Sequence, residues 1–184
     1  MVYARKEHDC IEKPSTQGEF AFGQNSEAKE TTPRISVVIL AYRSGEGIYP
    51  FVESIVRSLE NNEPDWEVIL VGNRFVDDGD PTPGIINKIA QTHPRIRAVT
   101  RIKEGMMGWD MKSGLDAATG RTLAVIDGDG QMPFEDVILV YRKLRDDNLD
   151  FVKTFRAKRG DGFYRKTIYV AYNIIFNSLF PGLK

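Results

Sequence analysis

Short apolar runs alternate with amphipathic stretches along most of this chain. Residues 35–41 are short, β-branched and almost wholly apolar, which is typical of a buried parallel strand. In residues 48–59, apolar side chains recur with a period near 3.6 and predict a helix with one buried face. These two patterns predict strands at 35–41, 66–72, 96–100, 122–126 and 151–155, and helices at 48–59, 84–92, 109–118, 134–145 and 168–179.

Alternation of strands and helices at this spacing is typical of an α/β protein. It predicts a single domain built on a doubly wound, mainly parallel sheet, with helices on both faces because the crossovers are right-handed. Parallel strands end at the same edge of a sheet, where such proteins bind their ligands. We therefore expect the loops at 42–47, 72–82, 103–108 and 127–132 to gather there.

The first 33 residues lack this periodicity. They are polar and mixed in charge, so we expect a disordered or loosely attached arm over residues 1–33 and the folded domain over 34–184. Of the 184 residues 41% are hydrophobic, enough for a core, and the net charge of −1 gives no basis for nucleic-acid binding. The single cysteine, Cys10, is compatible with a reducing compartment. No apolar run is long enough for a membrane span, which predicts a cytoplasmic chain and leaves peripheral contact with a membrane open.

Candidate chemistry is concentrated at the end of the predicted strand 122–126. The apolar run leads directly into Asp127-Gly128-Asp129-Gly130. Side chains two positions apart on an extended segment point the same way, so the two carboxylates are predicted to face one hard cation, or a cation and a sugar. The glycines leave the backbone open to close approach. The same residues also form a good acidic turn, and on their own they leave both interpretations open.

Four stretches in the same order carry a resemblance to a known family. They are the strands at 35–42 and 66–72, the helix at 109–120, and the strand and acidic turn at 122–133. Together they resemble family 2 glycosyltransferases with the GT-A fold, a Rossmann-like α/β arrangement, and Asp127-Gly128-Asp129 is similar to the D-x-D motif of that family. Residues 112–120 and the basic segment 156–165 look most like those of polyprenyl-phosphate (dolichol-phosphate) hexosyltransferases. The resemblance extends over residues 34–180.

The resemblance implies an inverting transfer of a hexose from a UDP- or GDP-linked donor to a polyprenyl phosphate at the cytosolic face of a membrane. It implies Mg²⁺ or Mn²⁺ as cofactor, with Asp129 as a direct ligand and Asp127 at the cation, the ribose or the sugar. Arg156, Arg159 and Arg165 would hold the phosphates, the alternative being a solvated basic loop. The other residues implied at the substrates are Ala41, Tyr42, Ser44, Glu46, Gly72, Asn73, Asp78, Met107, Lys112, Gly128 and Gln131.

Two departures from the family pattern bear on function. After the second strand the family reads V-D-D-G-S, with an acidic residue at the nucleotide base, whereas this chain has Gly72-Asn73 and then Asp77-Asp78 in a longer loop. Asn73 and the two aspartates are all candidates for recognising the base. The family also continues with a D-x-x-S-G-F-like acceptor segment, so a chain ending at Lys184 is expected to be a short or fragmentary transferase. The alternative is a non-catalytic nucleotide-binding or scaffolding relative.

Two apolar segments have open interpretations. Residues 106–109, Met-Met-Gly-Trp, form either a wall of the donor pocket or a hydrophobic plug over the start of a helix. The helix at 168–179 is apolar on nearly every side, and we expect it to pack under the acceptor segment. Contact with a membrane surface or a partner chain is the alternative. Neither interpretation predicts an oligomeric state.

Overall fold

The elements that position the site belong to the first of two compact units. A computed structural model of the chain describes residues 3–6 and 32–154 and the single helical positions 168, 172, 174 and 178. The two units are Met1–Thr154 and Phe155–Lys184. The first contains the strands β1 (Tyr3–Lys6), β2 (Ile35–Leu40), β3 (Trp66–Val71), β4 (Ile96–Val99), β5 (Thr122–Asp127) and β6 (Phe151–Lys153), the 3₁₀ turn η1 (Gly45–Gly47), and the helices α1 (Ile48–Asn62), α2 (Thr82–Thr92), α3 (Met107–Ala117) and α4 (Glu135–Asp146).

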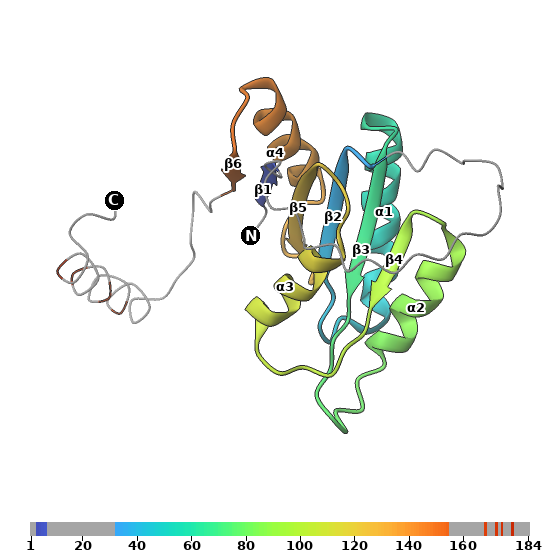
Figure 1. Ribbon diagram of the computed structural model, residues 1–184. Helices are drawn as coiled ribbons and strands as arrows, with labels where there is room; N and C mark the ends of the chain where they lie inside the picture. The colour runs from blue at the N-terminus through green and yellow to red at the C-terminus, as the bar shows by residue number, and fades with distance from the viewer. Residues whose placement is uncertain are drawn as a thin grey trace, which may run out of the picture. The chain divides into compact units, whose positions relative to one another are not determined.

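One sheet, in the strand order β4-β3-β2-β5-β1-β6, organises this unit (Figure 1). Strands β2 to β5 run parallel, which confirms the mainly parallel α/β arrangement predicted from the sequence. The register pairs Leu40 of β2 with both Val71 of β3 and Asp127 of β5, and Val71 with Val99 of β4. These four strands therefore end at a common edge, and the loops that follow them gather there as predicted.

Helices cover both faces of the sheet, because successive residues of a strand point to opposite sides. Val37 and Ile39 of β2 belong to the larger core, which is filled from α1, α2 and α4. Val38, between them, belongs to a smaller core that includes Met111 and Leu115 of α3. All the elements predicted between residues 35 and 155 are present, with ends displaced by at most three residues.

Strand β1 corrects the prediction of a loose arm for the start of the chain. Tyr3–Lys6 pairs antiparallel with β5 on one side and with β6 on the other, and Ala4 is fully buried. The segment Tyr3–Lys6 combines two apolar residues with two basic ones, so no periodic pattern marks it as a strand. Its order comes from backbone hydrogen bonds to strands far away in the sequence, which a reading of neighbouring residues does not reveal.

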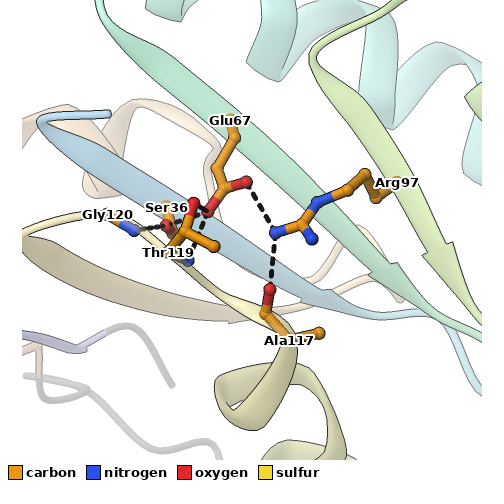
Figure 2. Close-up of polar contacts among 6 residues, drawn as sticks. All are labelled: Ser36, Glu67, Arg97, Ala117, Thr119 and Gly120. Atoms are coloured by element: carbon orange, nitrogen blue, oxygen red, sulfur yellow. Dashed lines mark hydrogen bonds and ion pairs between the residues drawn. The ribbon is translucent and has the colours of Figure 1, made fainter. Parts of the chain in front are cut away.

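A buried carboxylate links several elements at the edge of the sheet where the parallel strands begin, opposite the edge that carries the binding loops (Figure 2). Glu67, in β3, is 7% exposed and accepts hydrogen bonds from Ser36 Oγ at 2.5 Å and from the backbone N–H and hydroxyl of Thr119 at 2.6 and 2.9 Å. Its second oxygen pairs with Arg97 at 2.7 Å. Ser36 Oγ in turn accepts the N–H of Gly120 at 2.7 Å. The cluster therefore links β2, β3, β4 and the turn before β5.

The Glu67 cluster predicts a loss of stability in acid. Burial raises the pKa of Glu67, but hydrogen bonds from Ser36 and Thr119 and the charge of Arg97 outweigh it, so the pKa lies below the ordinary 4.5. Such a carboxyl stabilises the fold above its unfolded pKa, and this stabilisation disappears as the pH falls through the folded value. We expect Glu67→Gln to lower the free energy of unfolding by about 2 kcal/mol at pH 7. On acidification, the free energy of unfolding is expected to fall less in the variant than in the wild type. Chemical denaturation at pH 7 and at pH 4 measures both, and an unchanged acid dependence in the variant would contradict this role.

Candidate active site

The acidic turn follows β5 directly. Asp127 is the last residue of β5, and the chain then turns, with Gly130 at a φ of +69°. Gly128 donates its N–H to the carbonyl of Leu40 at 2.8 Å. A Cβ at residue 128 would lie 3.0 Å from both that carbonyl oxygen and Ile48 Cδ1. Glycine at this position therefore serves close packing against β2, and the acidic turn is tied to the first parallel strand.

Asp129 lies on this turn and not on an extended strand. Its side chain is exposed, and Oδ1 accepts the backbone N–H of Gln131 at 2.9 Å, as in an Asx turn. The expectation that Asp127 and Asp129 point the same way assumed extended backbone through both residues, but β5 ends at Asp127. The structure instead presents one carboxylate at the end of the strand and a second on the turn beside it.

The loop after β2 adjoins the acidic turn. Ala41 is buried, and its N–H is bonded to the carbonyl of Val71 at 2.8 Å. Ser44 donates its hydroxyl to the carbonyl of Gly128 at 3.2 Å. Glu46 is exposed in η1. Of these predicted substrate contacts, Ser44 is thus joined to the acidic turn by a hydrogen bond, whereas Ala41 belongs to the core.

A long acidic loop, residues 72–81, is fastened to the same place. Arg43 Nη2 pairs with Asp78 Oδ1 at 2.5 Å, and the Arg43 N–H is bonded to Asp80 Oδ2 at 3.3 Å. The Asp78 side chain is 3% exposed, and within the described part of the chain its Oδ2 has no hydrogen-bond partner. Asp77 is exposed, with a φ of +58°. Of the two aspartates that could recognise the nucleotide base, Asp78 is therefore the one that is held against the loop after β2.

Asn73 lies under this edge and not on its surface. Its side chain is fully buried and its amide donates to Asp110 Oδ1 at 2.9 Å and to Ser113 Oγ at 2.8 Å. Asn73 was one of three candidates from the sequence for recognising the nucleotide base, and in the structure its amide makes internal hydrogen bonds. Gly72 likewise has a packing role, because a Cβ there would lie 2.6 Å from Ile86 Cδ1.

A buried ion pair that the sequence did not indicate lies beside Asn73. Lys103 Nζ and Asp110 Oδ2 are 2.5 Å apart, and the two side chains are 3% and 5% exposed. Lys103 Nζ also lies 3.8 Å from the ring centroid of Tyr42, within the range of a cation–π interaction. The available sequence signal is an aspartate in the first turn of a helix, where acidic residues are common for other reasons.

A cleft of about 470 Å³ opens at α3 and the loop before it. It is lined by Arg101, Ile102, Glu104, Trp109, Lys112, Ser113 and Asp116. Lys112, one of the predicted substrate contacts, is exposed and pairs with Asp116 at 2.5 Å. Met106 and Met107 are both exposed, whereas Trp109 of the same segment is half-buried and lines the cleft. Arg156, Arg159, Arg165 and most of the predicted helix at 168–179 lie outside the described residues.

The carboxylates of the acidic turn have the chemistry of a hard-cation site. Mg²⁺ and Mn²⁺ prefer oxygen ligands and commonly bind through one or two carboxylates together with substrate phosphates and water. In residues 32–154 no group of three or more His, Cys, Asp or Glu side chains could enclose a metal ion. Among the described residues, Asp127 and Asp129 therefore fit a cation that completes its coordination with a bound ligand.

Comparison with known proteins places the chain among sugar transferases. The family described as "Glycosyl transferase family 2" matches residues 36–181. The dodecaprenyl-phosphate galacturonate synthase of Rhizobium johnstonii is 26% identical over 137 residues, which are 73% of this chain and 39% of that protein. The undecaprenyl-phosphate 4-deoxy-4-formamido-L-arabinose transferase of Proteus mirabilis is 25% identical over 138 residues, 75% of this chain and 41% of that protein. The chain spans about two fifths of the length of these relatives.

A solved structure is also similar to part of the chain. The mannosyltransferase PcManGT from Pyrobaculum calidifontis, in complex with GDP-Man and Mn²⁺, aligns with 54% of this chain and 28% of its own, at a TM-score of 0.38 and 23% identity. For the part of the chain described, none of the helices combines the length and the hydropathy needed to cross a membrane.

The match to the glycosyl transferase family runs from β2 through β6 and includes the acidic turn. The chain therefore belongs to glycosyl transferase family 2.

Proposed function

We propose that this chain supplies the nucleotide-sugar site of a glycosyltransferase that acts on a polyprenyl phosphate. The observation that carries the proposal is the acidic turn Asp127-Gly128-Asp129, which follows β5 at the edge where parallel α/β sheets bind ligands. The loop after β2 is bonded to this turn, so both belong to one site. The names of two relatives, which contain dodecaprenyl phosphate and undecaprenyl phosphate, support a lipid phosphate as acceptor.

The acidic turn would hold a divalent cation, Mg²⁺ or Mn²⁺. Asp129, exposed on the turn, would be the direct ligand, and Asp127 would contact the cation, the ribose or the sugar. Once bound, such a cation neutralises negative charge on the departing diphosphate. This assignment is consistent with the presence of two carboxylates, since the diphosphate and water supply the other ligands.

The nucleotide lies along the loops after β2 and β3. Asp78 Oδ2 is buried without a hydrogen-bond partner among the residues described, and a buried acceptor in this state lowers stability. A hydroxyl of the ribose or an N–H of the base, from UDP or GDP, would satisfy it. Tyr42 and Ser44 flank the nucleotide on the side of the acidic turn. Asp78 therefore takes the place of the acidic residue that the family usually has directly after this strand.

The acceptor needs no strong general base, because a lipid phosphate is already an anion at neutral pH. Arg156, Arg159 and Arg165 neutralise the donor diphosphate and the acceptor phosphate, since guanidinium groups bind phosphate oxygens in pairs. Direct attack by the phosphate oxygen on the anomeric carbon forms the new C–O bond as the bond to the diphosphate breaks, and it inverts that carbon. With a lipid acceptor, the reaction would take place at a membrane, and we expect it at the cytosolic face.

Calorimetric titration tests the donor site. UDP, GDP and their hexose conjugates are titrated into the full chain with and without Mn²⁺, and we expect one of the two nucleotides to bind only when the cation is present. A transfer assay with undecaprenyl phosphate then tests the acceptor. Binding without transfer would favour a non-catalytic nucleotide-binding role. The departure from the family pattern at Gly72-Asn73, after β3, supports this alternative. A folded chain that binds neither nucleotide would contradict the proposal.

A further inference from the structure

Lys103 has a position that the proposed contacts to substrates do not explain. Its ammonium group lies 2.5 Å from Asp110 Oδ2, 3.8 Å from the ring centroid of Tyr42 and 5.4 Å from that of Phe75. A buried cation is costly unless its partners replace the water that it has lost. Asp110 supplies the opposite charge, and the two aromatic faces supply the remaining favourable surroundings. The ammonium group is therefore shared between helix α3 and the loops after β2 and β3.

The two charged residues, Lys103 and Asp110, are held in place by contacts that do not involve Tyr42. Asn73, fully buried after β3, donates to Asp110 Oδ1 at 2.9 Å. The backbone N–H of Lys103 is bonded to the carbonyl of Arg74 at 2.9 Å. Both charged groups are therefore anchored to the end of β3. Tyr42, in contrast, is 36% exposed and lies on a loop. The other cation over its ring is Arg43 of the same loop, 5.3 Å from the ring centroid, so the ammonium group of Lys103 is the cation that ties the ring to the interior.

The loop that carries Tyr42 leads directly to the acidic turn. Two residues further along, Ser44 donates its hydroxyl to the carbonyl of Gly128 at 3.2 Å. Gly128 lies between the two carboxylates proposed to serve the donor. The Tyr42 ring and the backbone of the acidic turn are therefore connected through a short segment and one hydrogen bond.

We infer that Lys103 is a positioning residue of the nucleotide-sugar site, which holds the Tyr42 ring and thereby keeps loop 41–44 in the conformation that receives the donor. This inference rests on the proposed function. Lys103 is not itself a contact for the donor, because its side chain is 3% exposed and its charge is paired with Asp110. It acts through Tyr42, so the effects of changing the two residues on donor affinity are not independent.

A double-mutant cycle tests the inference. Lys103→Met, Tyr42→Leu, Tyr42→Phe and the double variant Lys103→Met/Tyr42→Leu are titrated with UDP and GDP in MnCl₂. We expect about a tenfold loss of affinity for Lys103→Met and for Tyr42→Leu, and a smaller loss for Tyr42→Phe than for Tyr42→Leu, because phenylalanine keeps the ring. The double variant is expected to bind no more weakly than the weaker single variant, because additive losses indicate independent roles. Lys143→Met, the same change at an exposed lysine in the last turn of α4, serves as the control with wild-type affinity.

The design keeps the inference testable where a variant is unstable. Lys103→Met leaves Asp110 without its counter-charge, so Lys103→Met/Asp110→Asn is measured beside it, with thermal unfolding of every variant. Wild-type affinity in folded Lys103 variants, or additive losses, would overturn the inference and leave the proposed function intact. Equal nucleotide affinities of Tyr42→Phe and Tyr42→Leu would also overturn it, and this comparison leaves the buried Lys103–Asp110 pair unchanged. A folded wild-type chain that binds neither nucleotide would overturn the proposed function, and this inference with it.

Discussion

The Asp129→Ala variant is expected to lose cation-dependent nucleotide binding while it keeps its fold. Asp129 is exposed, and its hydrogen bond within the described chain is the one from the backbone N–H of Gln131. Losing this bond costs about 1 kcal/mol of stability. Losing a direct cation ligand removes several kcal/mol of charge stabilisation, so we expect affinity for the nucleotide in Mn²⁺ to fall about 100-fold, or about 2.7 kcal/mol.

The comparison that decides this prediction is the nucleotide affinity with and without Mn²⁺ in two alanine variants. Glu135→Ala is the matched control, because it removes an exposed carboxylate from the first turn of α4, a few residues after the acidic turn. We expect its nucleotide affinity to equal that of the wild type at both cation concentrations. If Asp129→Ala retained cation-dependent binding, the carboxylate at position 129 would not be a ligand, and the proposed donor site would lose its main support.

The fold could be predicted from the sequence because its signals are local. Parallel strands buried on both faces appear as nearly continuous apolar runs, broken in β2 by Ser36 alone and in β3 by Glu67 alone. Helices with one buried face show the 3.6-residue period, as in α1. Strand β1 has neither signal. Its pairing with β5 and β6 is a property of the assembled sheet, and it could not be predicted from Tyr3–Lys6 alone.

The candidate site was predictable only where a continuous motif carries it. Asp127-Gly128-Asp129 stands out in the sequence, whereas nothing in the sequence indicates that Asn73, Lys103 and Asp110 are buried together. Residues of these three types are usually exposed, and here their burial follows from the way α3 packs over the end of β3. Asn73 was a candidate for the ligand because it stands where the family usually has an acidic residue at the nucleotide base. Its amide instead satisfies a buried carboxylate, a pairing between residues that are distant in the sequence.

The Gly120→Ala substitution is expected to destabilise the fold strongly, although it adds a single methyl group. A Cβ on Gly120 would lie 2.5 Å from Ser36 Oγ, 2.7 Å from Ser36 N and 2.9 Å from the carbonyl carbon of Ile35. Two of these atoms belong to the backbone of the central strand β2, which cannot give way by a rotamer change. The methyl would also displace Ser36 Oγ, which accepts from Gly120 and donates to Glu67. Overpacking and the damaged cluster together cost about 3–4 kcal/mol.

Urea denaturation at pH 7 measures this loss against a glycine that has open space. A Cβ on Gly84, in the first turn of α2, would meet nothing within 4 Å, and alanine there is expected to stabilise the chain by about 0.5 kcal/mol. The same methyl group thus has opposite effects at the two positions. Equal stabilities of Gly120→Ala and the wild type would show that the turn before β5 moves away from β2 at little cost. Because Gly120 lies at the edge opposite the acidic turn, the folded fraction of Gly120→Ala is expected to bind the nucleotide normally, which separates loss of stability from loss of the donor site.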